Sequence, residues 1–314
     1  MTTKPTIETV AKDIRELLEG VKTGTHKVSF TSPELLSSLG LRTANAFRRT
    51  LSADTKVRPE ATFYASEIGS KCYRQLWYKY HKPELAEKLS ASVAMKFLYG
   101  SIIEEVVLKL AELAGHEVSK EQESVEHTQY GVTVRGRIDA VIDDAVVDVK
   151  SVSTYGFKDF RDGLGGDKFG YKQQLAFYHW KMGYAAYPKR GFIAVDKQLG
   201  HIEYCPEPVE DVGFDDIFQK LDRVVNSTNG NPFDRLQTVV DGVNLKLGVE
   251  CGYCGYKYEC WFSANGGRGP RAFKYSGKVT WLVQVNKEPR VPEITFPTAV
   301  GVAKTGDGTE DATI

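Results

Sequence analysis

The chain has 314 residues, of which 41% are hydrophobic and 26% charged, an ordinary composition for a soluble globular protein. Lys plus Arg and Asp plus Glu number 41 each, which argues against a protein that holds nucleic acid by bulk charge but is compatible with a local basic groove. No apolar stretch has the form of a signal peptide or membrane span, so we expect a cytoplasmic protein without a membrane partner. The five cysteines are unevenly spaced, which favours metal ligation over a disulfide framework.

The first 60 residues are expected to form a helical accessory region. Ser32 and Pro33 have the form of an N-cap followed by proline at the first helical position. Apolar residues recur at helical spacing in the first part of the region: Val10, Ile14, Leu17, Leu18 and Val21. No chemistry is recognisable here, and a packed accessory layer is the favoured interpretation.

Residues 66–82 are predicted to form a helix that contains the first cysteine, Cys72. Basic and aromatic residues alternate along it: Lys71, Arg74, Trp77, Tyr78, Lys79, Tyr80 and Lys82. Such a helix either contacts phosphates and bases or is an ordinary amphipathic helix with a solvated face. The second interpretation is favoured.

Residues 98–113 have a helical stripe of apolar residues that flanks two adjacent carboxylates. One and two helical turns after Glu104 the residues are Leu108 and Ala111, so the Glu104 side chain is expected to be partly buried. A buried carboxylate needs a partner, either a basic residue or a metal. Glu105 is expected to be exposed and paired with Lys109 one turn on.

Two β-branched runs, residues 132–142 and 145–152, flank the polar pair Asp143-Asp144 and predict a β-hairpin with a two-residue turn. The antiparallel register then pairs Ile142 with Ala145, Val141 with Val146 and Ala140 with Val147. Continued by one residue, it places Asp139 opposite Asp148.

Two carboxylates opposite each other repel, unless a cation lies between them. Mg²⁺ prefers oxygen ligands, and a divalent cation is the most economical reason for this pairing. Lys150 lies two residues after Asp148 and therefore projects from the same face of the strand. The alternative is a solvent-facing hairpin whose charges fall in phase.

The next segments continue an α/β pattern. A glycine-rich loop is expected over residues 154–170. A helix over residues 171–180 would place Tyr171, Gln174 and Tyr178 on one face. Two strands and a further helix are expected over residues 191–196, 201–205 and 209–225.

Cys251, Cys254 and Cys260 form a C-x2-C-x5-C pattern that needs a fourth donor from elsewhere. Cys72 is the natural candidate, since Cys205 lies in a strand-like run. Four thiolates suit either structural zinc or an iron-sulfur cluster, and the pattern alone leaves both open.

The C-terminal part begins with a basic stretch, residues 266–278, that contains no acidic residue. Its basic residues are Arg268, Arg271, Lys274 and Lys278. It is interpreted either as a contact for single-stranded nucleic acid or as an ordinary solvated stretch. A strand is expected over residues 279–285, and residues 301–314 are predicted to be disordered.

Taken together, these motifs resemble a known family. Ile138-Asp139 followed by Asp148-Val149-Lys150 is similar to the bipartite PD-(D/E)XK nuclease signature, with Ile in place of Pro. Five motifs follow one another between Ser66 and Trp261. In chain order they are a cysteine, Gly-x-x-x-Glu, the bipartite signature, Gln-x-x-x-Tyr and C-x2-C-x5-C. The order resembles the iron-sulfur branch of the RecB-like PD-(D/E)XK exonucleases, which includes CRISPR-associated exonucleases, the AddB nuclease domain and many phage exonucleases.

The resemblance implies a fold and a set of site residues. The implied fold class is α/β, with a restriction-endonuclease-like core, a mixed central sheet flanked by helices, and an iron-sulfur subdomain that joins the N- and C-terminal parts. The expected domain organisation is a helical accessory region (1–60), a nuclease domain that contains the four cysteines (61–265), a C-terminal extension (266–300) and a disordered tail (301–314). The implied metal ligands are Glu104, Asp139 and Asp148. The implied catalytic residues are Lys150, Gln174 and Tyr178. The implied ligands of a [4Fe-4S] cluster are Cys72, Cys251, Cys254 and Cys260. Glu104 stands where many relatives carry His.

The function implied by the resemblance is that of a Mg²⁺- or Mn²⁺-dependent DNA exonuclease in the cytoplasm of a bacterium or a phage-infected host, acting in recombination, repair or replication. Implied partners are single-stranded DNA or duplex ends, with any helicase, recombinase or single-strand-binding protein supplied by a separate chain; a homo-oligomer is one option. The alternative is a non-catalytic nucleic-acid-binding adaptor with a structural zinc or iron-sulfur site.

Overall fold

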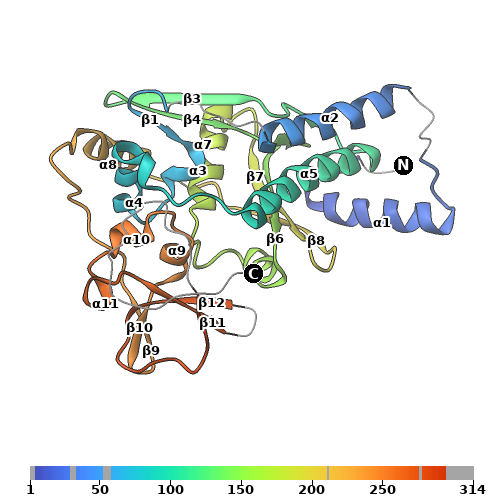
Figure 1. Ribbon diagram of the computed structural model, residues 1–314. Coiled ribbons are helices and arrows are strands. Elements are labelled where there is room, and N and C mark those ends of the chain that lie inside the picture. The colour runs from blue at the N-terminus through green and yellow to red at the C-terminus, as the bar shows by residue number, and fades with distance from the viewer. Residues whose placement is uncertain (1–3, 29–32, 52–57, 211, 276–277, 295–314) are drawn as a thin grey trace. The chain divides into compact units, whose positions relative to one another are not determined.

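The computed structural model describes residues 4–28, 33–51, 58–210, 212–275 and 278–294 (Figure 1). The chain divides into two compact units: unit 1 comprises residues 1–76 and 89–230, and unit 2 comprises residues 77–88 and 231–314. The predicted disordered tail lies outside the described residues. The domain boundaries expected from the sequence stay predictions.

The central sheet of unit 1 is mixed and has the strand order β2-β5-β6-β7-β8. Strands β6 and β7 are parallel, and the other neighbours are antiparallel. A second sheet has the order β1-β4-β3. The strands are β1 (Thr62–Tyr64), β2 (Val118–Ser119), β3 (Ser124–Gln129), β4 (Val132–Arg137), β5 (Ala140–Ile142), β6 (Ala145–Val152), β7 (Lys189–Asp196) and β8 (Ile202–Pro206).

The predicted N-terminal helices are confirmed, and the second begins at Pro33 as expected. Ser90 and Ser153 cap α5 and α6, because each hydroxyl accepts a hydrogen bond from a backbone N–H of the first turn. The helical elements of unit 1 are η1 (Ile7–Thr9), α1 (Val10–Thr23), α2 (Pro33–Leu51), α3 (Ala65–Ile68), α5 (Ala91–Leu113), α6 (Thr154–Arg161), α7 (Tyr171–Met182) and α8 (Phe214–Asn226); α4 (Tyr73–His81) begins in unit 1 and ends in unit 2.

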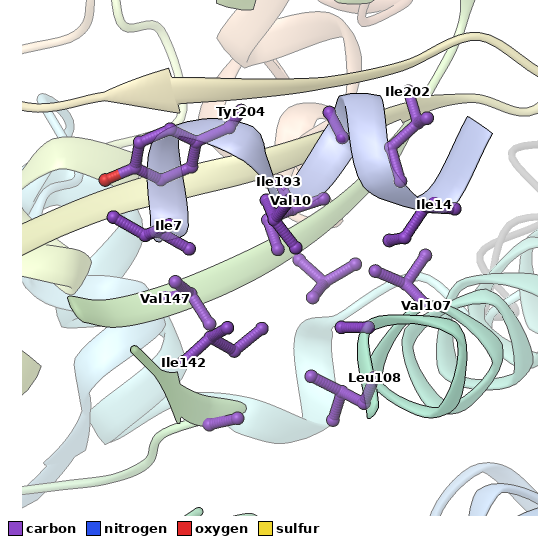
Figure 2. Packing of buried hydrophobic residues seen from close by; sticks show 14 of the residues in the cluster. Ile7, Val10, Ile14, Val107, Leu108, Ile142, Val147, Ile193, Ile202 and Tyr204 are labelled. Carbon is purple, nitrogen blue, oxygen red and sulfur yellow. The ribbon is translucent and has the colours of Figure 1, made fainter. Parts of the chain in front are cut away.

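Helices α1 and α5 bury their apolar faces against the central sheet, as Figure 2 shows. Figure 1 shows α5 between α1 and α2. The buried cluster joins Ile7, Val10 and Ile14 at the N-terminus to Val107 and Leu108 of α5 and to strand residues Ile142, Val147, Ile193, Ile202 and Tyr204. Because alternate residues of β6 face this core, the other residues of that strand face away from it.

The β5–β6 hairpin has the predicted register, with Ile142 opposite Ala145 and Ala140 opposite Val147. Its turn residues Asp143 and Asp144 have φ of 46° and 71°, which is typical of a type I′ turn. Asp143 Oδ1 accepts a hydrogen bond from the backbone N–H of Glu117 at 3.0 Å, which ties the turn to the preceding loop.

Several expectations about element boundaries are wrong. The helix over residues 66–82 is broken after Ile68, because Gly69 packs so closely on Gly170 that a Cβ at Gly69 would lie 2.4 Å from the Gly170 Cα. The predicted strand over residues 132–142 is split between two sheets. The glycine-rich loop begins instead with helix α6.

Unit 2 contains an antiparallel sheet of order β13-β11-β12-β10-β9. Its small core is formed by Leu247, Cys251, Ala272, Trp281 and Val283. The elements are η2 (Pro83–Leu85), β9 (Val239–Asp241), β10 (Asn244–Lys246), α9 (Val249–Gly252), α10 (Lys257–Cys260), α11 (Ala264–Gly267), β11 (Arg271–Tyr275), β12 (Lys278–Gln284) and β13 (Glu293–Ile294). Among the helices that the structure describes, none is long and apolar enough to cross a membrane.

Candidate active site

Strand β6 presents Asp148 and Lys150 on the face opposite the core. Val147 and Val149 belong to the buried cluster, so strand alternation directs the two charged side chains the other way. Lys150 Nζ lies 2.5 Å from Asp148 Oδ2, and the Asp148 side chain is 2% exposed. The predicted placement of these two residues on one face is confirmed.

Asp139 lies just before β5 and is not part of the strand ladder, which ends at Ala140 opposite Val147. Its carboxylate instead accepts a hydrogen bond from the backbone N–H of Val149, with 2.7 Å between N and Oδ2. The strand-to-strand pairing of Asp139 with Asp148 predicted from the register is therefore replaced by a side-chain-to-backbone contact with the residue between Asp148 and Lys150.

Helix α7 supplies the partners of Lys150. Asp167 accepts hydrogen bonds from the backbone N–H groups of Gly170, Tyr171 and Lys172, which fixes the start of the helix. Lys150 Nζ donates to Gln174 Oε1 at 3.4 Å and lies 4.9 Å from the centre of the Tyr171 ring. The ammonium group is thus held between a carboxylate, an amide and an aromatic face.

Tyr178 follows Gln174 one turn along α7, and its hydroxyl accepts a hydrogen bond from Gln174 Nε2 at 3.0 Å. The ring is packed against β4: a Cβ added at Gly136 would lie 2.5 Å from Tyr178 Cε1 and 2.7 Å from Ala65 Cβ. Glycine at this position therefore allows the close approach that sets the position of Tyr178 and, through it, of Gln174.

Glu104 of α5 is partly buried, as predicted. Its Oε1 accepts a hydrogen bond from Gln122 Nε2 at 2.5 Å and lies 3.6 Å from Arg49 Nη2. The exposed pair expected between Glu105 and Lys109 is wrong. The Glu105 side chain is 9% exposed and is bound by Arg49 and Arg42 of α2, while Lys109 binds Glu112.

The electrostatic environment follows from burial and from the proximity of like charges. Burial, then the charges of Glu104 and Asp148, raise the pKa of Asp139 well above its usual value. Burial also raises the pKa of Glu104, and the charge of Arg49 opposes this. Burial alone would lower the pKa of Lys150, but the charges of Asp148 and Asp139 outweigh it and raise the pKa, so the group is an ammonium ion at neutral pH.

The chemistry of this donor set fits a hard divalent cation. Glu104, Asp139 and Asp148 offer carboxylate oxygens, which Mg²⁺ and Mn²⁺ prefer, and their mutual repulsion is the kind that a cation relieves. As the side chains are placed, each carboxylate has a partner within the protein. Across the described ranges, no group of three or more His, Cys, Asp or Glu side chains forms a metal-holding arrangement.

The cysteines of the second motif lie in and around two short helices of unit 2. Cys251 is in α9, Cys260 is in α10, and the backbone N–H of Tyr256 donates a hydrogen bond to Cys254 Sγ at 3.4 Å. Cys72 lies just before α4, in unit 1. The predicted iron-sulfur subdomain is not seen as an assembled site in the part of the chain that the structure describes.

Cys205 is buried in β8, and burial raises the pKa of its thiol to about 12. This agrees with its exclusion from the predicted ligands.

The interpretation of residues 266–278 as a basic contact stretch needs correction at Arg271. Its guanidinium binds Glu288 and Glu293, which follow later in the chain, and its side chain is 10% exposed. Arg271 is therefore a structural cation of the unit 2 sheet.

Sequence reasoning missed Arg49, Gln122 and Asp167. Arg49 and Gln122 are single polar residues far in the sequence from Glu104, and no spacing pattern marks them. Asp167 lies just before α7, and an acidic residue ahead of a helical pattern is a helix-start signal that could have found it.

Residues 42–260 match the family described as "PD-(D/E)XK nuclease superfamily". No curated protein matches the chain. Among solved structures, the chain is similar to the "Crystal structure of SSO0001", with 17% identity, a TM-score of 0.42, and coverage of 74% of this chain and 98% of that chain. It is also similar to an alkaline exonuclease, LHK-Exo, from Laribacter hongkongensis, with 16% identity, a TM-score of 0.39, and coverage of 58% and 90%.

Proposed function

Because the chain belongs to the PD-(D/E)XK nuclease superfamily, we propose that it is a metal-dependent DNA exonuclease whose active site is the Asp139, Asp148 and Lys150 face of the hairpin. The observation that carries this proposal is the position of Lys150. Its ammonium group is buried against Asp148 and directed toward Gln174 of α7. A charged lysine beside buried carboxylates offsets their negative charge, and it suits a site that must bind a phosphate.

Glu104, Asp139 and Asp148 would hold Mg²⁺ or Mn²⁺. When bound, such a cation polarises the scissile phosphate and balances its charge. The raised pKa of Lys150 keeps it protonated, so it acts as a positive charge and hydrogen-bond donor to a phosphate oxygen or the attacking water. Gln174 keeps the ammonium group in place, and Tyr178 keeps Gln174 in place.

The same proposal includes a [4Fe-4S] cluster held by Cys72, Cys251, Cys254 and Cys260. The hydrogen bond from Tyr256 N–H to Cys254 Sγ is of the kind that stabilises a thiolate. Cys72 directly precedes α4, and Tyr78 of that helix stacks on Tyr256 with 5.4 Å between ring centres.

The biological setting belongs to the proposal as well. DNA ends in the cytoplasm of a bacterium or a phage-infected cell would be the substrate, in recombination, repair or replication. A helicase, recombinase or single-strand-binding protein would be a separate chain.

The test is digestion of single- and double-stranded DNA oligonucleotides labelled at the 5′ or 3′ end, with Mg²⁺ or Mn²⁺ and with excess EDTA. The proposal predicts stepwise loss of nucleotides from an end in the presence of the cation and none with EDTA. Cleavage that persists in EDTA contradicts the metal role. Binding of DNA without degradation under either cation supports the adaptor alternative. Iron and zinc analysis of the purified protein distinguishes the iron-sulfur cluster from zinc.

A further inference from the structure

Arg49, near the C-terminal end of α2, contacts two acidic residues of α5. Its Nη1 lies 2.8 Å from Glu105 Oε1, and its Nη2 lies 3.6 Å from Glu104 Oε1. The side chains of Arg49 and Glu104 are each 16% exposed. A guanidinium ion thus sits beside a carboxylate to which the proposed function gives a role in holding a divalent cation.

The two contacts of Arg49 differ in quality. The Glu105 contact has ordinary ion-pair length, whereas the Glu104 contact is too long for a hydrogen bond, and the buried Nη2 makes none. Glu104 can therefore leave Arg49 without breaking a hydrogen bond. A divalent cation on Glu104 would repel the guanidinium, because two positive charges would share one carboxylate in a poorly solvated place.

Several polar contacts of this kind join helix α2 to α5. Arg42 binds Glu105, Glu112 and Glu121, and Thr50 Oγ1 donates to Ser101 Oγ at 3.1 Å. Among the described side chains of α2, Ala46 is buried, whereas Leu36, Leu41, Phe47 and Leu51 are exposed. Since Ala46 is buried while these four larger apolar side chains are exposed, the ion pairs with α5 contribute to the position of α2.

We propose that Arg49 is a positioning residue that acts as the internal counter-ion of Glu104 and competes with the divalent cation for it. Cation binding at the active site and the hold of α2 on α5 are then coupled. By linkage, the factor by which the bound cation weakens the docking of α2 on α5 is also the factor by which docked α2 weakens cation binding. This inference rests on the proposed function only in taking Glu104 as a ligand.

The test combines Mn²⁺ titration by calorimetry with hydrogen exchange of residues 33–51 in the full chain. In the wild type, Mn²⁺ should speed exchange in α2. Arg49→Ala should bind Mn²⁺ roughly fivefold more tightly or better, and its α2 should exchange fast with or without the cation. Arg49→Lys keeps the charge and should stay near the wild type. Arg48→Ala removes an exposed charge from the same helix and serves as the matched control.

The outcomes separate this inference from the proposed function. If the wild type binds Mn²⁺ but α2 exchange does not respond, and Arg49→Ala has wild-type affinity, the coupling is wrong and the metal site stands. If neither protein binds Mn²⁺, both ideas fail. The exchange measurement on the wild type decides the matter even if Arg49→Ala does not fold.

Discussion

The backbone N–H of Val149 donates a hydrogen bond to the carboxylate of Asp139, with 2.7 Å between the two atoms. The donor belongs to the peptide group that joins Asp148 to Val149, so the Asp139 carboxylate is fixed by the strand that carries Asp148 and Lys150. A change that shifts β6 by one residue would therefore disturb all three residues together.

Replacing Asp139 by Asn should stabilise the cation-free protein at neutral and higher pH. The raised pKa means that the folded protein keeps the Asp139 proton at pH values where the unfolded chain has lost it. The stability of the wild type therefore falls as the pH rises from about 3.9, the unfolded-state value, through the folded-state pKa. The Asn side chain does not titrate and can still accept the Val149 hydrogen bond.

Urea denaturation in EDTA over a pH series measures this effect. The advantage of Asp139→Asn should be on the order of 1 kcal/mol at pH values above the folded-state pKa, and should shrink toward acid pH. Asp144→Asn, at the exposed turn position, is the control and should show no such trend. A destabilised Asp139→Asn at high pH would show that the carboxylates do not repel one another in the folded protein.

Gly136→Ala should reduce both stability and cleavage. The new methyl group would overlap the Tyr178 ring and Ala65, so the expected cost is about 1–3 kcal/mol. A displaced Tyr178 also loses Gln174, and with it the support of Lys150. Gly100→Ala is the matched control: it lies within α5 with open space around its Cβ position and should gain up to about 1 kcal/mol.

Cys→Ser variants test the proposed cluster. Cys72, Cys251, Cys254 and Cys260 should each be needed for full iron content and for the visible absorption of an iron-sulfur protein. Cys205→Ala should keep both, because that thiol is buried in the central sheet of unit 1. Equal loss of iron from the Cys205 variant would contradict the assignment of the four other cysteines as cluster ligands. Zinc instead of iron in the purified wild type would show that these cysteines form a structural zinc site.

The hairpin was predictable because its determinants are local. Alternating β-branched residues and the Asp143-Asp144 turn specify both register and face, and the facing of Asp148 and Lys150 follows from the same period of two. The grouping of Tyr171, Gln174 and Tyr178 follows similarly from helical spacing.

Other features depend on residues far away in the sequence. The interruption after Ile68 is explained by the close approach of Gly170, and nothing near Gly69 announces it. The strand predicted over residues 132–142 is interrupted at Ile138 and Asp139. There the backbone N–H of Ile138 donates a hydrogen bond to the carbonyl of Glu123, and the carbonyl of Asp139 accepts one from the N–H of Gln122. The helical pattern of residues 98–113 predicts an exposed Glu105, whereas in the structure α2 supplies Arg42 and Arg49, which bind its carboxylate.

The most direct measurement is single-turnover cleavage of an end-labelled DNA oligonucleotide with Mg²⁺ or Mn²⁺ by the wild type, Asp148→Asn and Lys150→Ala. Lys158→Ala, which removes an exposed lysine from α6, controls for the loss of one positive charge. We expect Asp148→Asn and Lys150→Ala to lose cleavage, at least about a hundredfold, while both remain folded by circular dichroism and Lys158→Ala cleaves like the wild type. Wild-type rates in folded Lys150→Ala would contradict the assignment of this face of the hairpin as the active site.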